Sequence, residues 1–190
     1  MTNKIQEANL AMVVSKTFSG LNVNALRYLL PLWIAPLTGV TFRCVFAAVA
    51  FWIIGYWAKP ETASVKDKIY LFLLGAVGIY GYMFSYLMGL SKTTPVSAAI
   101  FTSMQPIWVF ILSVFFFNEK ATVMKIVGIL VGLGGALLCI STQKSDDLAS
   151  DAFSGNLFCL VSSVIYAVYL ILSNRFLKRT GPYTLMRYTF

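Results

Sequence analysis

Hydroxyl, amide and amine groups lie inside long apolar segments of the sequence, and these are the residues that could do chemistry. A polar side chain in hydrocarbon costs free energy, so it normally faces a protein interior or a wet cavity. Residues 8–30 are the richest segment, and Ser15, Ser19 and Asn22 recur there at the spacing of one helical face. We expect these three residues to line a substrate cavity, and hydrogen bonding between helices is the alternative role.

Two cations also lie within apolar segments. Lys16 could join the same cavity, or its amine could reach the cytoplasmic surface along its own alkyl chain. Arg43 stays protonated and therefore needs a partner or water. For Arg43 we favour an interfacial anchor near the outer leaflet over an anion contact, with Arg187 as its counterpart near the inner face.

Tyrosines and small polar residues of later segments complete the set. A tyrosine ring has an apolar face and one hydrogen-bonding tip, which suits stacking on a planar or amphipathic substrate; core packing is the alternative. Pro106 removes the amide that would donate to the carbonyl of Thr102, which permits a helix kink and a role in gating. The candidate cavity residues are Ser15, Lys16, Ser19, Asn22, Tyr82, Ser85, Tyr86, Thr102, Gln105, Tyr166 and Tyr169.

The residues that are absent limit the chemistry. The sequence has no histidine, its three cysteines lie singly in apolar segments, and no Asp or Glu lies deep within six of those segments. Histidine acid–base catalysis and histidine-ligated zinc are therefore excluded. We predict no catalytic residue, metal or cofactor. A proton-coupled exchanger usually needs a buried carboxylate, so coupling residues would lie in a second repeat, or transport is facilitated or of exchange type.

The composition places these residues in a membrane. Of 190 residues 58% are hydrophobic and only 12% charged, against about 25% charged in a soluble domain. This balance excludes a soluble enzyme, a nucleic-acid-binding module and a disordered chain. We predict an all-α polytopic membrane protein with six transmembrane helices plus the start of a seventh. The segments are 8–30, 35–57, 69–90, 95–117, 123–140 and 155–172, with the seventh beginning near Pro182.

The loop charges predict an orientation. If the N-terminus is cytoplasmic, nine Lys and Arg residues lie in inside regions and three in outside loops. This asymmetry fits the positive-inside rule, so we predict a cytoplasmic N-terminus. The inside residues are Lys4, Lys59, Lys66, Lys68, Lys120, Lys125, Arg175, Lys178 and Arg179, and the outside residues are Arg27, Lys92 and Lys144.

Weak internal similarity indicates a repeat. The stretch from Pro36 to Arg43 is similar to that from Pro182 to Arg187, and Ser15 aligns with Ser162. Five helices separate the two copies, so the second enters the membrane from the opposite side, as in inverted-repeat transporters. We therefore expect a first five-helix repeat at 1–142, an extracytoplasmic loop at 143–154 and the start of a truncated second repeat at 155–190.

Regularly spaced glycines predict close helix contacts. Gly128 and Gly132 are four residues apart, a spacing that lets helices approach closely. Helix packing is the favoured role and a homodimer contact is the alternative. Gly75, Gly78 and Gly81 recur every three residues and predict packing likewise.

Several motifs resemble the EamA-type family of the drug/metabolite transporter superfamily. They are Phe18-Ser-Gly-Leu-Asn22, Arg43, the block from Gly89 to Ile100, Gln105-Pro106, Phe117-Asn-Glu119-Lys120 and the stretch from Gly128 to Gly132. The block that opens the fourth segment is the specific part. The resemblance implies ten helices in two inverted five-helix repeats and transport of small metabolites, often outward.

These observations predict a membrane permease for small metabolites, an exporter of amino-acid or drug/metabolite type that works by alternating access and is present as an incomplete chain. We expect it in the bacterial inner membrane. Its partners would be the lipid bilayer, a small-molecule substrate, and a homodimer or a separate second repeat, with no nucleic acid. The main alternative is a non-transporting membrane subunit or fragment that packs with another membrane protein. A membrane enzyme acting on lipid is disfavoured by the absent acid–base groups.

Overall fold

The computed structural model describes residues 2–30, 32–57, 63–117, 122–141 and 151–190, and its regular elements there are all helices. Glu119, Lys120 and most of the expected loop 143–154 lie outside the described residues. The elements are α1 (Thr2–Leu29), α2 (Pro36–Trp57), α3 (Val65–Leu74), η1 (Gly75–Tyr80), α4 (Gly81–Lys92), α5 (Pro95–Ser103), α6 (Gln105–Phe117), α7 (Val123–Ser141), α8 (Ala152–Thr180) and α9 (Pro182–Thr189).

Within the described residues, four helices are long and apolar enough to cross a membrane. They are Pro36–Trp57, Val65–Lys92, Pro95–Phe116 and Ala152–Thr180, and Val123–Ala136 is a shorter apolar helix. The 28 residues of α1 are not among the four, because Ser15, Lys16 and Asn22 interrupt its apolar sequence. The all-helical membrane class is thus established, whereas six spans plus a seventh stay a prediction.

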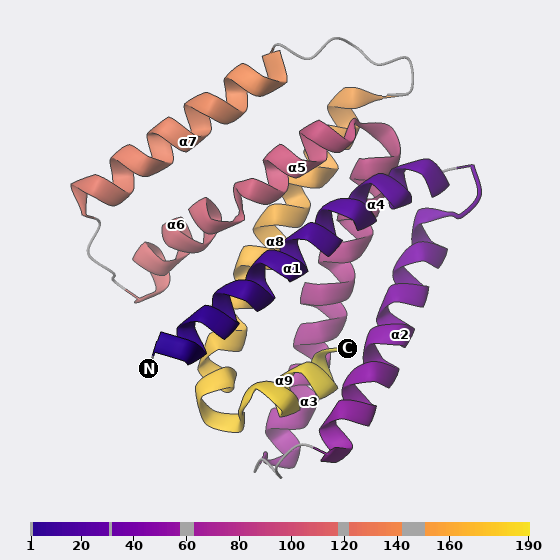
Figure 1. Cartoon of the computed structure of the whole chain (residues 1–190), viewed down its shortest axis with the longest axis vertical. Coiled ribbons are helices and arrows are strands. Elements are labelled where there is room, and N and C mark those ends of the chain that lie inside the picture. The colour runs from indigo at the N-terminus through magenta and orange to yellow at the C-terminus, as the bar shows by residue number, and fades with distance from the viewer. Residues whose placement is uncertain (1, 31, 58–62, 118–121, 142–150) are drawn as a thin grey trace.

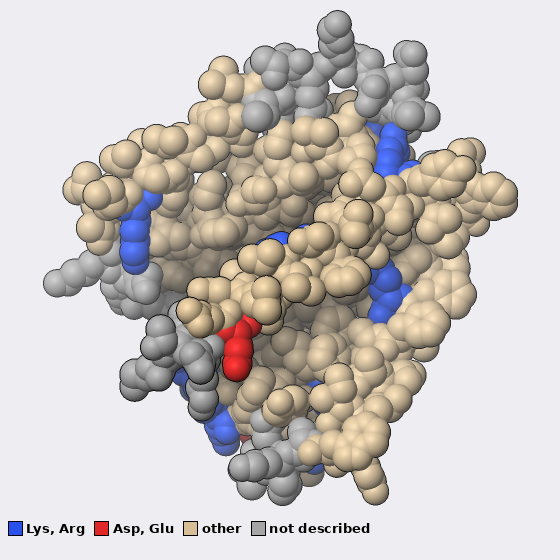
Figure 2. Space-filling view, in the orientation of Figure 1, with Lys and Arg blue, Asp and Glu red and all other residues tan. Residues whose placement is uncertain are grey.

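The long segments α1, α2, α3–α4, α5–α6, α7 and α8 run in alternating directions (Figure 1). In this view α1 crosses the front of the bundle, α2 flanks it on the right, and α7 forms the outer edge on the left. Helix α8 packs most extensively on α4 and then on α6. The face in Figure 2 is mostly uncharged, with lysine and arginine in separate patches. Large apolar surfaces that face outward are expected where lipid surrounds the helices.

Local sequence explains where several helices begin. Thr94 accepts a hydrogen bond from the Ser97 amide (3.2 Å) and precedes Pro95, which suits the first helical position. Asp151 accepts one from the Ser154 amide (3.2 Å) and caps α8 in the same way. Gly181 has φ 86°, a conformation that glycine adopts without strain, and it separates α8 from α9.

Small residues allow α4 and α8 to cross closely. A Cβ on Gly89 would lie 2.5 Å from the Cys159 sulfur, and one on Gly155 would lie 2.8 Å from the Thr93 Cβ. The Thr93 hydroxyl also donates a hydrogen bond to Asn156 Oδ1 (2.7 Å). The connection between α4 and α5 is therefore fixed to the first turns of α8.

The glycines that pack are not those expected from the α7 spacing. Gly75 contacts the backbone of Thr189, and Gly78 contacts the Tyr169 ring. By contrast, a Cβ on Gly128 meets no atom within 4 Å among the described residues, and one on Gly132 lies 3.8 Å from the Ile107 side chain. A packing role for Gly128 is therefore not seen here, because α7 lies at the edge of the bundle (Figure 1).

Helix α1 is attached through its last turns. The Arg27 guanidinium donates hydrogen bonds to the carbonyls of Leu90 and Ser91, each 3.0 Å long. These carbonyls belong to the end of α4, where the helix has unpaired acceptors and a partial negative charge. Leu26 packs against the hydrophobic core beside these bonds, and Leu30, just past the end of α1, lies within it.

Candidate functional site

Four tyrosines from two helices form one stacked group, which we call the tyrosine cluster. Tyr82 and Tyr86 lie one turn apart on α4, and Tyr166 and Tyr169 lie one turn apart on α8. The ring centroids are 4.7 Å apart for Tyr82 and Tyr166, 6.2 Å for Tyr82 and Tyr86, and 6.0 Å for Tyr166 and Tyr169. The structure therefore brings together all four tyrosines that the sequence singled out, because α4 and α8 are the most closely packed pair.

Gln105 adds a polar group to the tyrosine cluster. Its side chain lies within reach of the Tyr82 hydroxyl. Its Nε2 atom is buried and has no hydrogen-bond partner of good geometry among the described residues. Ser85 is also buried on α4, between Tyr82 and Tyr86 in sequence. A buried donor without a partner costs roughly 1–3 kcal/mol, so Gln105 is able to donate to a ligand.

The helix that carries Gln105 is interrupted. Helix α5 ends at Ser103 and α6 begins at Gln105, with Met104 between them at ψ −9°. This break lies two residues before Pro106. Thr102 does not offer a free hydroxyl, because its Oγ1 donates to the carbonyls of Ala98 (3.1 Å) and Ala99 (2.9 Å).

A second irregularity lies in the helix that carries Tyr82 and Tyr86. The continuous helix Val65–Lys92 contains the π-helical segment η1, directly before Gly81 and Tyr82. π-Helical turns are rare and occur often at functional sites. The glycines of this segment had indicated close packing, but their spacing did not predict a change of helical hydrogen bonding.

The polar face of α1 is not part of the tyrosine cluster. Ser15, Lys16, Ser19 and Asn22 are all exposed in the structure. The contacts of α1 come from its last turns instead. Helical spacing places Ser15, Ser19 and Asn22 on one face of α1, but it does not show which helix covers that face. The role of this face as a cavity wall stays a prediction.

The two arginines that were predicted to lie within apolar segments have different surroundings. Arg43 is partly buried on α2, within Coulombic range of the hydroxyls of Tyr82 and Tyr86. Arg187 on α9 places its guanidinium carbon 3.8 Å from the ring centroid of Trp52 on α2, a cation–π geometry. The role of Arg43 as an interfacial anchor stays a prediction.

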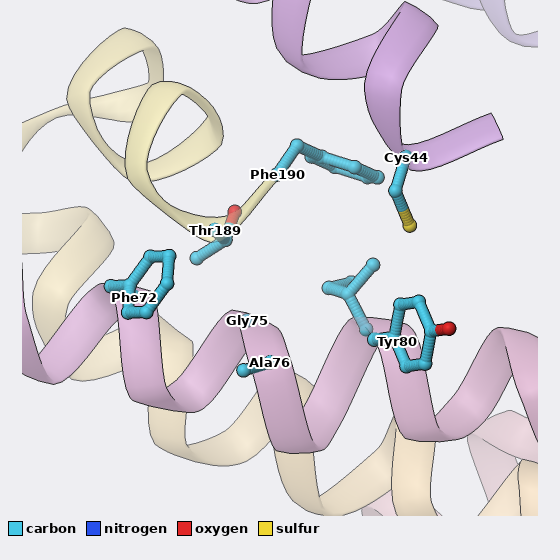
Figure 3. A pocket seen from close by; sticks show the side chains of 8 residues that line it. Cys44, Phe72, Gly75, Ala76, Tyr80, Thr189 and Phe190 are labelled. Carbon is cyan, nitrogen blue, oxygen red and sulfur yellow. The ribbon is translucent and has the colours of Figure 1, made fainter. Parts of the chain in front are cut away.

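A small pocket lies below the cluster's helices, between α2, η1 and α9 (Figure 3). Its volume is about 190 Å³. Cys44 and the Phe190 ring approach each other across it, with Tyr80 and Thr189 at its edges (Figure 3). The lining is mostly apolar, so the pocket suits a small hydrocarbon group. No group of three His, Cys, Asp or Glu residues that could hold a metal occurs in the part of the chain that the structure describes.

Nothing in the residue spacing pointed to Asp67 or Trp108. Asp67 is buried in the first turn of α3 and lies 3.7 Å from the Arg179 guanidinium of α8. The third apolar segment was expected to begin at residue 69, which left Asp67 in the preceding loop, whereas α3 begins at Val65. Trp108 lies one turn after the helix break, and its Nε1 is buried without a partner among the described residues. A tryptophan in an apolar run gives no sign of such an unpaired donor.

Comparison with known proteins identifies the family. Residues 6–141 match the EamA-like transporter family, so the chain belongs to that family. The resemblance seen in the sequence motifs is thereby confirmed, and the family points to a membrane transporter rather than an enzyme.

Individual relatives support the same assignment. The chain is 26% identical over 175 residues to the uncharacterized transporter YyaM of Bacillus subtilis (strain 168), and the match covers 90% of this chain and 57% of that protein. It is 27% identical over 105 residues to the aromatic amino acid exporter YddG of Ancylobacter novellus, covering 55% of this chain and 37% of the exporter.

A solved structure has a similar fold. It matches with a TM-score of 0.55 and 21% identity, and the match covers 93% of this chain and 64% of that one. This chain spans about 57–60% of the length of the curated relatives with the highest coverage.

Proposed function

We propose that this chain forms part of a permease that exports small amphipathic metabolites, of amino-acid or drug/metabolite type, by alternating access. The observation that carries the proposal is the tyrosine cluster with the unpaired amide of Gln105 beside it. Family membership supports transport in general, and the exporter named among the relatives supports the outward direction.

The chemistry of the cluster suits a substrate with an apolar or planar part and a polar end. Each aromatic contact contributes about 0.5–1.5 kcal/mol beyond its buried area. The Gln105 amide would donate to a carbonyl or carboxylate, which removes the penalty of leaving that donor unpaired. Arg43 lies within Coulombic range of the Tyr82 hydroxyl and adds attraction for an anionic end.

The two helix irregularities support a moving site. The break at Met104 lies next to Gln105, and η1 lies next to Tyr82. Transporters commonly place discontinuous helices around a central substrate site, because freed backbone groups bind ligands and the breaks act as hinges. We infer that two segments bend, the one around Met104 and η1, when the site changes from facing one side of the membrane to facing the other.

A second unit belongs to this proposal. The chain spans 57% of YyaM and 60% of an archaeal transporter of Archaeoglobus fulgidus. We infer that transport needs a second five-helix repeat, from a longer chain or a second copy, and that residues for energy coupling lie there. The N-terminus is cytoplasmic in this proposal, and the bacterial inner membrane is its location.

The test measures export as uptake into everted membrane vesicles, whose cytoplasmic face lies outside, from a panel of labelled amino acids and nucleosides. Tyr82→Leu should lower the export rate of the substrate about fivefold to tenfold, because it removes stacking at the centre of the cluster. Tyr70→Leu is the matched control, since Tyr70 stacks on Phe176 outside the cluster. Equal losses in both variants, or no export of any compound by a chain that includes both repeats, would overturn the proposal.

A further inference from the structure

A groove between α6 and α8 shares no residue with the tyrosine cluster or with the pocket of Figure 3. Its volume is about 440 Å³. Its walls include Val109, Leu170 and Leu177, whereas Ser113, Asn174 and Lys178 supply polar atoms. The helices that form it, α8 and the pair α5–α6, are both long and apolar enough to span a membrane, so the groove borders the bilayer.

The polar and apolar parts of the groove lie at different heights along α8. Leu170, Asn174, Leu177 and Lys178 share one face, because they follow each other at helical spacing. A helix of 29 residues is about 43 Å long, whereas the hydrocarbon core is about 30 Å thick. The last turn of α8 therefore reaches the headgroup level, and Leu170 lies about 12 Å deeper.

The mouth of the groove carries positive charge that the described residues do not neutralise. The end of α8 has three cations, Arg175, Lys178 and Arg179. Arg179 interacts with Asp67 of α3 at 3.7 Å. No ion-pair partner for Lys178 occurs within the described ranges. Lys178 is the charged residue of the groove lining.

We propose that this groove binds an anionic phospholipid, with the phosphate at Lys178 and Asn174 and an acyl chain along Val109, Leu170 and Leu177. A soluble anion would gain nothing from the apolar walls, and an apolar helix would leave the Lys178 amine unpaired. A phospholipid satisfies both ends, and basic pockets between membrane helices are suited to such headgroups. This site is independent of the transport proposal, because it uses none of the cluster residues.

The test measures lipid binding by the purified chain in nanodiscs, with brominated phosphatidylglycerol or brominated phosphatidylcholine as the probe. Quenching of Trp108, on α6 next to Val109, reports an acyl chain in the groove, after the other three tryptophans are replaced by phenylalanine. Phosphatidylglycerol should quench at lower mole fraction than phosphatidylcholine. Lys178→Gln should weaken phosphatidylglycerol binding about fivefold, the contribution of one basic residue at the surface.

Two matched controls separate this site from general surface effects. Arg175→Gln removes a charge from the same end of α8 without touching the groove lining, and it should leave quenching within twofold. Leu170→Trp would fill the groove, and native mass spectrometry should then show less bound phosphatidylglycerol. Leu172→Trp, at an exposed position, is its control. Equal losses in Lys178→Gln and Arg175→Gln, or equal binding of the two lipids, would each overturn the proposal.

Discussion

The Thr93 hydroxyl donates a hydrogen bond to Asn156 Oδ1 at 2.7 Å, and this bond joins the turn after α4 to the first turns of α8. Thr93 is almost fully buried. The bond lies beside the close contacts of Gly89 and Gly155, at one end of the interface that carries the tyrosine cluster. The position of Tyr166 against Tyr82 therefore depends on a polar contact at the end of the same helix pair.

Thr93→Val should destabilise the protein by about 1–2 kcal/mol. Valine keeps the shape of threonine but leaves Asn156 Oδ1 in its partly buried position without its donor, and an unpaired polar atom costs up to roughly this amount. Denaturant unfolding in mixed micelles, followed by circular dichroism, measures the change. Thr122→Val at an exposed position is the control. An unchanged free energy of unfolding would mean that water replaces the lost donor.

Gly89→Val and Gly128→Ala should have opposite effects. A side chain on Gly89 would overlap the Cys159 sulfur and the Gly155 carbonyl oxygen, so α4 and α8 would separate at a cost of about 1–3 kcal/mol or more. Gly128 has open space around it in the described structure, so alanine there should be neutral or stabilise α7 by up to about 1 kcal/mol.

Thermal unfolding in detergent distinguishes the two glycines. If Gly128→Ala lowers the midpoint as strongly as Gly89→Val, then α7 packs on another helix or another copy through Gly128. That result would favour the packing role that the four-residue spacing had predicted.

Sequence patterns predicted the apolar helices because long apolar runs are local features, although α8 continues to Thr180, beyond the expected end at 172. Pro95 and Gly181 mark helix boundaries through their own backbone geometry. The four tyrosines were among the eleven candidate cavity residues, and one-turn spacing places the two members of each pair on one helix face. What the patterns could not supply is which faces meet.

Contacts between distant segments account for the differences. Arg27 looked like a loop cation, but it binds carbonyls 63 and 64 residues away, at the end of α4. Asp67 had no visible partner until α8 brought Arg179 to it. The π-helical segment η1 also depends on neighbours, because Thr189 and Tyr169 press against its glycines. None of these contacts has a local signal in the sequence.

Arg27→Met should release α1 from the bundle. The substitution keeps the apolar stem but removes two charge-assisted hydrogen bonds to the Leu90 and Ser91 carbonyls, each worth about 1.5–3 kcal/mol. Hydrogen exchange should accelerate throughout α1 and leave α8 unchanged. Arg27→Lys keeps the charge with fewer donors and should give an intermediate rate. Uniform acceleration across all helices would indicate global destabilisation instead.

The start of α8 should loosen at low pH. Hydrogen bonds from Ser154 hold the pKa of the exposed Asp151 carboxyl below its ordinary value. Because the folded pKa lies below the unfolded value of about 3.9, this cap stabilises the helix fully above that pH and is lost as the pH falls through the folded pKa. The protection of the Ser154 amide against exchange, relative to the intrinsic rate at the same pH, should therefore fall below about pH 4. In Asp151→Asn this pH-dependent change should be absent. If it persists in that variant, another titrating group causes it.

Pro106→Ala tests what causes the helix break at Met104. Alanine restores an amide that can donate to the Thr102 carbonyl, so α5 and α6 should merge into one straighter helix. Spin labels at the exposed Val96 and Phe115 measure this by pulsed electron resonance, since an ideal helix places these positions about 28 Å apart. The distance should lengthen in Pro106→Ala and stay unchanged in Pro95→Ala, because proline at a first helical position removes no helical bond. If Pro106→Ala leaves the distance unchanged, the hydroxyls of Thr102 and Ser103 become the cause, since both bind carbonyls one turn earlier and such bonds bend helices.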